Sequence, residues 1–268
     1  MATSLSELRS PAGQAATSPR PIDLPRIEGL DLHSRYQSAR CGGDFFDAVA
    51  IGSRAVFLLM DIAGRRPETH TIAVDVQNVF RTRAQELFEH SDANESEGIA
   101  LLARDINRSL IEAAQRVRLA PAFVGCYNLT LHILTYHYAG HLLAVFRDAE
   151  KTRVLEAGGI PLGLFTHSTY EPAVLGFDPH AKLLLVTKGI AESRRGSAIL
   201  DDERIRLLLE NATTDSASEI CEAVLRAADG LGNQPWSRVY DFFHPRNPRF
   251  PDDLTAVALV RRGDAPET

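Results

Sequence analysis

The spacing of hydrophobic residues switches between strand-like and helix-like patterns along the chain. Two β-prone runs, FFDAVAI at residues 45–51 and AVFLLMD at 55–61, are three residues apart, a gap typical of a β-hairpin. A first strand is expected near residues 32–36. Apolar residues then recur at intervals of three and four, which predicts helices over residues 68–89 and 95–116.

Pro121 ends the second of these helices, and β-prone runs follow it as far as residue 146. Further strands are expected near residues 152–157, 169–175, 182–186 and 254–262, with helices over 201–209 and 217–228. The order is therefore strands, two helices, strands, two helices and a strand. It predicts an α+β fold with sheets in the middle and helices outside.

Two segments differ in composition from the rest. Residues 1–22 are rich in Ser, Ala and Pro, which predicts a disordered arm or linker before one domain over residues 23–264. Residues 232–252 read as a proline-containing loop, yet they include Trp236, Tyr240 and Phe243. This loop either forms a local apolar cluster or serves as a lid or docking surface for a protein partner.

Charge and composition exclude several classes of function. The formal net charge of −6 leaves no basic footprint for nucleic acid or an anionic membrane, and no apolar run approaches the length of a membrane span. Three widely spaced cysteines form neither a disulfide framework nor a zinc motif. The sequence therefore predicts a cytoplasmic protein.

Acidic residues gather where the predicted strands begin or end. Asp44 and Asp47 lie at the start of one strand, Asp61 closes the next, and Asp252 and Asp253 precede the last. Oxygen ligands of this kind suit Mg²⁺ or Mn²⁺, and paired ions can activate a water for attack on a phosphoester. Asp beside Gly is also common in turns and helix caps, so each acid alone has a structural interpretation.

Six short motifs follow one another along the chain: ARCGGDFFDAV, LLMDIAG, YHYAGHLLAV, GGIPLGL, LLLVTKGIAES and FPDDLTAVAL. Together they resemble the metal-dependent protein phosphatase superfamily, in the bacterial branch typified by sporulation stage II protein E. The resemblance runs from about residue 24 to 262. It implies a four-layer α-β-β-α sandwich of two antiparallel sheets. It also implies removal of phosphate from serine or threonine of a protein, an anti-sigma-factor antagonist being one candidate partner.

The resemblance also implies roles for individual acids. Asp61 matches the aspartate that bridges two metal ions, and Ile62 would offer the neighbouring backbone carbonyl. Asp252 matches the aspartate that completes the principal metal site, so Asp61 and Asp252 are the expected catalytic pair. Asp47 is expected to bind metal, and Asp44 to act directly or through water. Asp253 is expected to lie just outside the ligands.

The sequence departs from the family pattern at three places. Arg65 and Arg66 replace the second half of its glycine-rich turn, Gly125 stands where the family has a threonine in the following strand, and Lys188, within Thr187-Lys188-Gly189, stands where the family has a metal-ligating aspartate. A protonated lysine cannot ligate Mg²⁺ or Mn²⁺. We expect its ammonium to lie among the acids in place of metal; the alternative is a side chain turned into solvent, which leaves room for one ion.

These departures leave two functions open. The first is a protein serine/threonine phosphatase with an impaired metal site that uses Mg²⁺ or Mn²⁺. The second is a pseudophosphatase without a cofactor, in which Lys188 supplies the missing positive charge and the pocket binds a phosphoprotein or a regulator.

Overall fold

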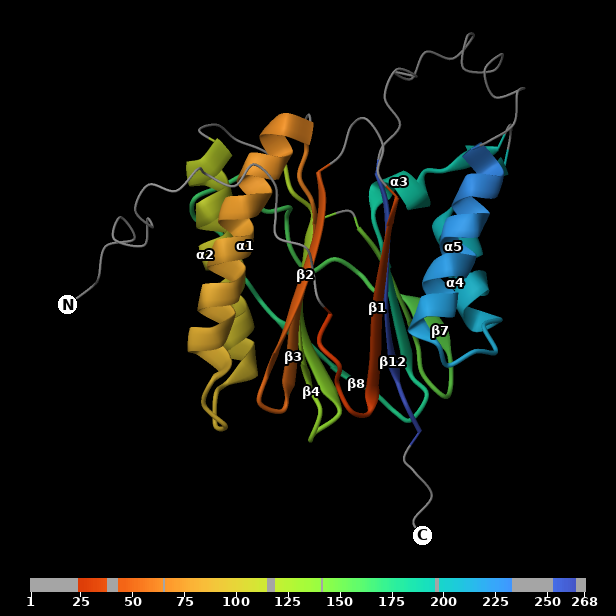
Figure 1. The fold of residues 1–268 in the computed structure, drawn as a ribbon, viewed down its shortest axis with the longest axis horizontal. Coiled ribbons are helices and arrows are strands. Elements are labelled where there is room, and N and C mark those ends of the chain that lie inside the picture. The colour runs from red at the N-terminus through yellow and green to blue at the C-terminus, as the bar shows by residue number, and fades with distance from the viewer. Residues whose placement is uncertain are drawn as a thin grey trace, which may run out of the picture.

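Two five-stranded antiparallel sheets pack face to face, and helices cover both outer faces (Figure 1). The computed structural model describes residues 24–37, 43–64, 66–114, 119–140, 142–195, 198–232 and 253–263. One sheet has the strand order β1-β12-β9-β6-β7 and the other has β2-β3-β4-β5-β8. This α-β-β-α layering confirms the predicted fold class.

The strands and helices alternate along the chain in the expected order. The strands of the first sheet are β1 (Leu30–Gln37), β12 (Leu254–Arg261), β9 (Lys182–Val186), β6 (Leu143–Arg147) and β7 (Thr152–Val154). Those of the second sheet are β2 (Asp44–Ile51), β3 (Arg54–Asp61), β4 (Ala122–Asn128), β5 (Ile133–Ala139) and β8 (Ala173–Gly176). The helices are α1 (Arg66–Phe88), α2 (Glu95–Ala114), α3 (Lys188–Ala191), α4 (Asp202–Glu210) and α5 (Ala217–Gly232). Two short strands, β10 (Arg194–Arg195) and β11 (Ala198–Ile199), pair with each other in antiparallel fashion.

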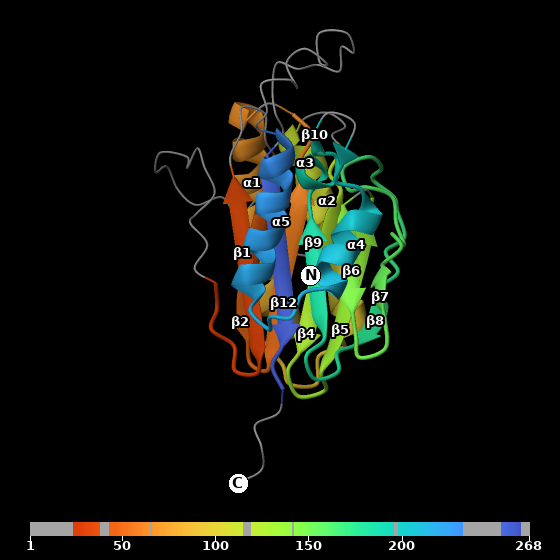
Figure 2. The ribbon, with the colours of Figure 1, turned by 90° about the vertical axis from the view of Figure 1, so that its right-hand side faces the viewer.

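Three apolar layers hold the sandwich together. Helices α1 and α2 pack on the outer face of the second sheet, with Val76, Phe80 and Ile106 fully buried against it. The layer between the sheets is aromatic, and Phe57, Phe123 and Tyr136 stack in succession there. Helices α4 and α5 cover the first sheet (Figure 2). Burial on this scale is the main favourable term in folding.

The β2–β3 hairpin sets the register of the edge where the acids lie. Gly52, in the turn, has a φ of +56°, a left-handed conformation that glycine adopts without steric strain. From this turn the two strands pair rung by rung, and the last pair joins Asp44 to Asp61. The hairpin therefore brings together two acids that are 17 residues apart in sequence.

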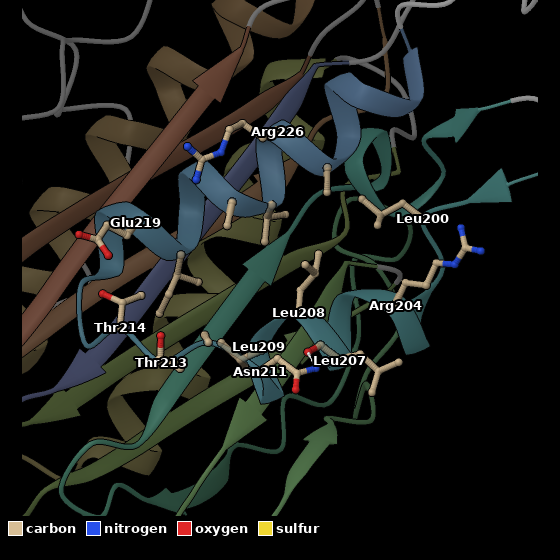
Figure 3. A pocket seen from close by; sticks show the side chains of 15 residues that line it. Leu200, Arg204, Leu207, Leu208, Leu209, Asn211, Thr213, Thr214, Glu219 and Arg226 are labelled. Atoms are coloured by element: carbon tan, nitrogen blue, oxygen red, sulfur yellow. Dashed lines mark hydrogen bonds between the residues drawn. The ribbon is translucent and has the colours of Figure 1, made fainter.

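The outer faces carry two hollows. A groove of about 680 Å³ lies between α4 and α5 and is lined mostly by apolar side chains, Leu208 and Ile220 among them (Figure 3). A second hollow, of about 650 Å³, lies between α2 and residues 166–170. Among the described residues, no helix is both long enough and apolar enough to cross a bilayer.

Candidate active site

Asp44 and Asp61 face each other across the last rung of the β2–β3 ladder. Directly opposite residues in an antiparallel pair have Cα atoms roughly 4.5–5.5 Å apart. Asp44 opens β2 after Gly43, and Asp61 closes β3 before Ile62, so both carboxylates lie at one end of the sandwich. The structure thus brings together two of the acids that the sequence singled out.

Asp44 ties one sheet to the other. Its Oδ2 accepts hydrogen bonds of 2.6 Å from the Thr187 hydroxyl, at the end of β9, and from the Thr255 hydroxyl, in β12. The two threonines also bond to each other, because the Thr255 amide donates to Thr187 Oγ1 at 3.1 Å. A single carboxylate oxygen therefore fixes the distance between the sheets at this edge.

The pKa of the Asp44 carboxyl is raised to about 8, from an ordinary value of 3.8. Burial is the largest cause, and the negative charge of Asp61 is the second. The hydrogen bonds from Thr187 and Thr255 act in the opposite direction, and Asp253 adds a further rise. Burial and a neighbouring negative charge therefore both favour the protonated form of Asp44.

Asp253 joins the same edge from the other sheet. It is 2% exposed, and its Oδ2 accepts a 2.8 Å hydrogen bond from the Tyr36 hydroxyl of β1. The turn after β9 packs directly on it: a Cβ added to Gly189 would lie 2.1 Å from the Asp253 carbonyl oxygen. Only glycine permits this approach, which places the Thr187–Gly189 turn against the segment that enters β12.

The backbone after Asp61 is held from both sides. The Asp61 amide donates to the Pro121 carbonyl, and the Ile62 amide donates to the Gly43 carbonyl at 2.9 Å. A Cβ on Gly43 would lie 1.8 Å from the Ile62 carbonyl oxygen. The Ile62 carbonyl, expected from the resemblance to be a ligand, is therefore fixed at the same edge as Asp44, while its side chain is buried in the core.

Asp47 does not lie with the other acids, although the sequence interpretation put it among the metal ligands. Its carboxylate is fully buried and binds the Arg81 guanidinium of α1 through two hydrogen bonds, of 2.7 and 2.8 Å. Gln77 donates a third, at 3.1 Å. Successive side chains of a strand point to opposite faces, so Asp47, three residues after Asp44, faces the helices. Its contacts tie β2 to α1.

Lys188 does not place its ammonium among the acids. Its side chain is 54% exposed, and its Nζ lies 3.8 Å from Glu192 Oε1, one helical turn further on. Lys188 opens the short helix α3, which leads its side chain outward from the strand end. This geometry corresponds to the second of the two placements considered from the sequence, and it corrects the first.

Several predicted residues fall outside the described part of the chain. Asp252, Arg65 and the aromatic loop residues Trp236, Tyr240 and Phe243 lie there, as do residues 1–22, expected to form an arm. Arg66 is the first residue of α1, but its side chain is not described. Within the described residues, no group of three or more His, Cys, Asp or Glu side chains is arranged to hold a metal ion.

The chemistry of the donor set at this edge nevertheless suits a hard divalent cation. Two carboxylates on one rung and a fixed backbone carbonyl are oxygen ligands of the kind that Mg²⁺ and Mn²⁺ prefer. A cation here would offset the repulsion that raises the pKa of Asp44. The residues present therefore fit such an ion, with one ligand fewer than the family pattern because of Lys188.

Sequence reasoning missed Thr187 and Thr255 as parts of this site. Thr255 lies two residues after Asp253, which puts both side chains on one face of the strand entry. Thr187 directly follows the buried run of β9, at the same edge. The alternation of side chains in β12 could therefore have placed Thr255 on the same face as Asp253. The contact of the Thr187 and Thr255 hydroxyls with Asp44 could not be predicted, because it depends on how the two sheets pack.

Comparison with known proteins places the chain in a family. The family model for stage II sporulation protein E (SpoIIE) matches residues 52–261, well over half of the chain. Among solved structures, the RsbU and RsbW domains of Rv1364c from Mycobacterium tuberculosis match at a TM-score of 0.66 and 19% identity. That match covers 95% of this chain and 65% of the other, so the present chain spans about two thirds of that relative.

Two further structures share the fold. The SiaA-PP2C domain of Pseudomonas aeruginosa matches at a TM-score of 0.66 and 15% identity, over 87% of this chain and 85% of that one. RsbX in complex with magnesium matches at 0.60 and 14% identity, over 89% and 98%. At these identities the likeness concerns the fold alone. The fold, the motif order and the family match agree, and the chain belongs to the stage II sporulation protein E (SpoIIE) family.

Proposed function

We propose that this chain is a metal-dependent protein serine/threonine phosphatase whose metal site is weakened by the loss of one carboxylate. The observation that carries the proposal is the partly buried Asp44–Asp61 rung, where the pKa of Asp44 is raised by desolvation and by Asp61. Two neighbouring carboxylates repel each other when both are ionised, and a bound cation would offset that repulsion. A divalent cation is the partner that this edge best accommodates.

In this proposal Asp61, the Ile62 carbonyl and Asp252 hold the ion, with Asp44 beside them. A bound Mg²⁺ or Mn²⁺ supplies Lewis-acid chemistry, polarising the phosphoryl oxygens and activating a water. A cation held here would favour the ionised form of Asp44 over the protonated form that its raised pKa favours at neutral pH. Thr187 and Thr255 then keep the ionised carboxylate in place, since both hydroxyls already donate to its Oδ2.

Lys188 weakens the proposed metal site mainly because a carboxylate ligand is missing at this position. A side chain that is 54% exposed is screened by solvent, so its ammonium repels a nearby cation only modestly. The absent carboxylate removes a ligand and one negative charge. We therefore propose that the ion at Asp61 remains and that the affinity for a second ion is lost.

The substrate class follows from family membership rather than from the geometry. A phosphoserine or phosphothreonine of a regulatory protein is the proposed substrate, and an anti-sigma-factor antagonist is one candidate. The likeness to a chain that carries RsbU and RsbW domains supports this class of partner.

The test is hydrolysis of p-nitrophenyl phosphate and of a phosphoserine peptide with and without millimolar Mn²⁺. The wild type is expected to release phosphate slowly and only with metal. Asp61→Asn should abolish the metal-dependent rate, whereas Asp47→Asn should leave it as far as the variant remains folded. Equal rates in the wild type and in Asp61→Asn would contradict the proposal.

A pseudophosphatase is the second candidate, favoured by Lys188 at a ligand position. It predicts that Mn²⁺ produces no hydrolysis in the wild type, while Lys188→Asp gains both metal affinity and activity. The phosphatase proposal instead predicts measurable activity before the substitution and a faster rate after it.

A further inference from the structure

A hollow beside α2 lies outside the acidic edge and has no part in the proposed reaction. It has a volume of about 650 Å³ and lies between the helix and residues 166–170, which precede β8. That volume is in the usual range for sites that hold small ligands. Its lining includes two arginines and several hydroxyl-bearing residues, whereas leucines and alanines predominate among the residues that line the groove between α4 and α5 (Figure 3).

The basic wall of the hollow comes from one face of α2. Arg104 and Arg108 are four residues apart, so their side chains are neighbours on the helix surface. Arg104 forms an ion pair with Asp105, with 3.1 Å between Arg104 Nη2 and Asp105 Oδ1. Arg108 is exposed and makes no ion pair or hydrogen bond within the described residues. Glu112, one turn beyond, is the acidic member of the lining.

The opposite wall supplies hydroxyl and imidazole groups. Thr166, His167, Ser168, Thr169 and Tyr170 line the hollow together with the two arginines. The Tyr170 hydroxyl is buried, and its contacts with Ser168 and Asn107 are close enough to act on its pKa but too poor in geometry to form full hydrogen bonds. Most buried hydroxyls are fully satisfied, so this hydroxyl has capacity left for a ligand or water in the hollow.

This wall is fixed in place rather than free to move away from the helix. Asn107 is buried on α2, donates to the Phe165 carbonyl at 2.9 Å and accepts from the Gly163 amide at 2.8 Å. Leu162 then pairs with Ala120 through two backbone hydrogen bonds. The hollow is thus preorganised on the same scaffold that positions Asp61, whose amide bonds to the next residue, Pro121.

We propose that this hollow is an oxyanion site that binds a phosphomonoester group, distinct from the acidic edge. Guanidinium forks form charge-assisted, bidentate bonds to phosphate, and hydroxyls satisfy its remaining oxygens. The same chemistry is offered by free inorganic phosphate and by a phosphorylated side chain of a protein. The site does not depend on the proposed phosphatase activity, because none of its groups belongs to the acidic edge.

The test is an amide chemical-shift titration of the full chain with inorganic phosphate, a phosphoserine peptide and the same peptide unphosphorylated. EDTA is present throughout, so that no divalent ion draws phosphate to the acidic edge. Shifts are expected at residues 104–112 and 163–170. Tighter binding of the phosphopeptide than of phosphate assigns the site to a phosphoprotein, and equal binding assigns it to the free ion.

Arg108→Gln should weaken binding about tenfold, the typical effect of removing one charge-assisted hydrogen bond. Arg108→Lys keeps the charge and should retain part of the affinity. Arg226→Gln, which removes the same charge from exposed α5, is the matched control and should bind as the wild type does. The proposal is overturned if the wild type shows no shifts at these residues, if Arg108→Gln binds as tightly as the wild type, or if the unphosphorylated peptide binds equally well.

Discussion

Asp44→Asn tests whether the acidic edge is under electrostatic strain when no metal is bound. The amide has the shape of the carboxyl, and its Oδ1 can accept both threonine hydroxyls that now bond to Asp44 Oδ2. The substitution therefore removes the charge beside Asp61 and leaves the link between the sheets in place. Stability of the metal-free protein is the quantity to measure.

The magnitude follows from the pKa of Asp44, which rises from 3.8 to about 8 on folding. Between these values the folded chain keeps a proton that the unfolded chain has released, so stability falls as pH rises. Each pKa unit corresponds to about 1.4 kcal/mol, which gives a loss on the order of 4 kcal/mol by pH 7. That loss is absent below about pH 4 and complete above about pH 8.

Urea unfolding at half-unit steps from pH 5 to 8.5, with EDTA present, measures this effect. Wild-type stability should carry a downward slope approaching 1.4 kcal/mol per pH unit from this one group, and Asp44→Asn should lose that slope. Asp92→Asn, an exposed acid in the turn before α2, is the control for the general charge change. If Asp44→Asn is no more stable than the wild type at pH 8, burial and the charge of Asp61 do not destabilise the ionised Asp44 carboxylate as this account requires.

Three further substitutions test the packing around this edge. Thr255→Val should destabilise the protein by about 1–2 kcal/mol at pH 8 in urea unfolding, because it removes one hydrogen bond to Asp44; an unchanged midpoint would mean that the bond is not formed in solution. Gly189→Ala should lower the Tm by several degrees, because the added Cβ would lie 2.1 Å from the Asp253 carbonyl oxygen. Gly158→Ala, with open space around the added Cβ, is the control and should leave the Tm unchanged. Similar Tm values for the two variants would contradict the tight approach at Gly189. Arg81→Met should lower the free energy of unfolding by about 3–5 kcal/mol, because it leaves the buried Asp47 carboxylate without its ion-pair partner, and Mn²⁺ affinity should stay unchanged. A parallel loss of Mn²⁺ affinity would indicate that Asp47 belongs to the metal site.

Hydrophobic periodicity predicted most of the fold because each layer here obeys a simple repeat. The predicted helix over residues 68–89 is α1 (Arg66–Phe88), and the predicted strand at 182–186 is β9 (Lys182–Val186). Ends were less predictable: the strand expected at 169–175 begins only at Ala173, because the preceding residues form the wall of the α2 hollow instead of pairing with β5. The local pattern of polar and apolar residues does not show at which residue the strand begins to pair with its neighbour.

The candidate site was predicted only where strand ends determine it. Asp44 and Asp61 could be paired from the hairpin alone, since the register follows from the short turn between the strands. Asp47 was misplaced because motif resemblance was weighed without counting the strand's alternation, which turns it toward Arg81. The direction of Lys188 depends on where α3 starts, and one turn of helix carries too little sequence signal to show that.

Isothermal titration of Mn²⁺ into the metal-free protein tests the central claim most directly. The claim is that the Asp44–Asp61 edge holds a divalent cation despite Lys188. Wild type should bind one equivalent and release a proton at pH 7, Asp61→Asn should not bind, and Lys188→Asp should bind more tightly and take up a second ion. Absence of binding in the wild type at millimolar Mn²⁺, or equal binding by Asp61→Asn, would contradict it.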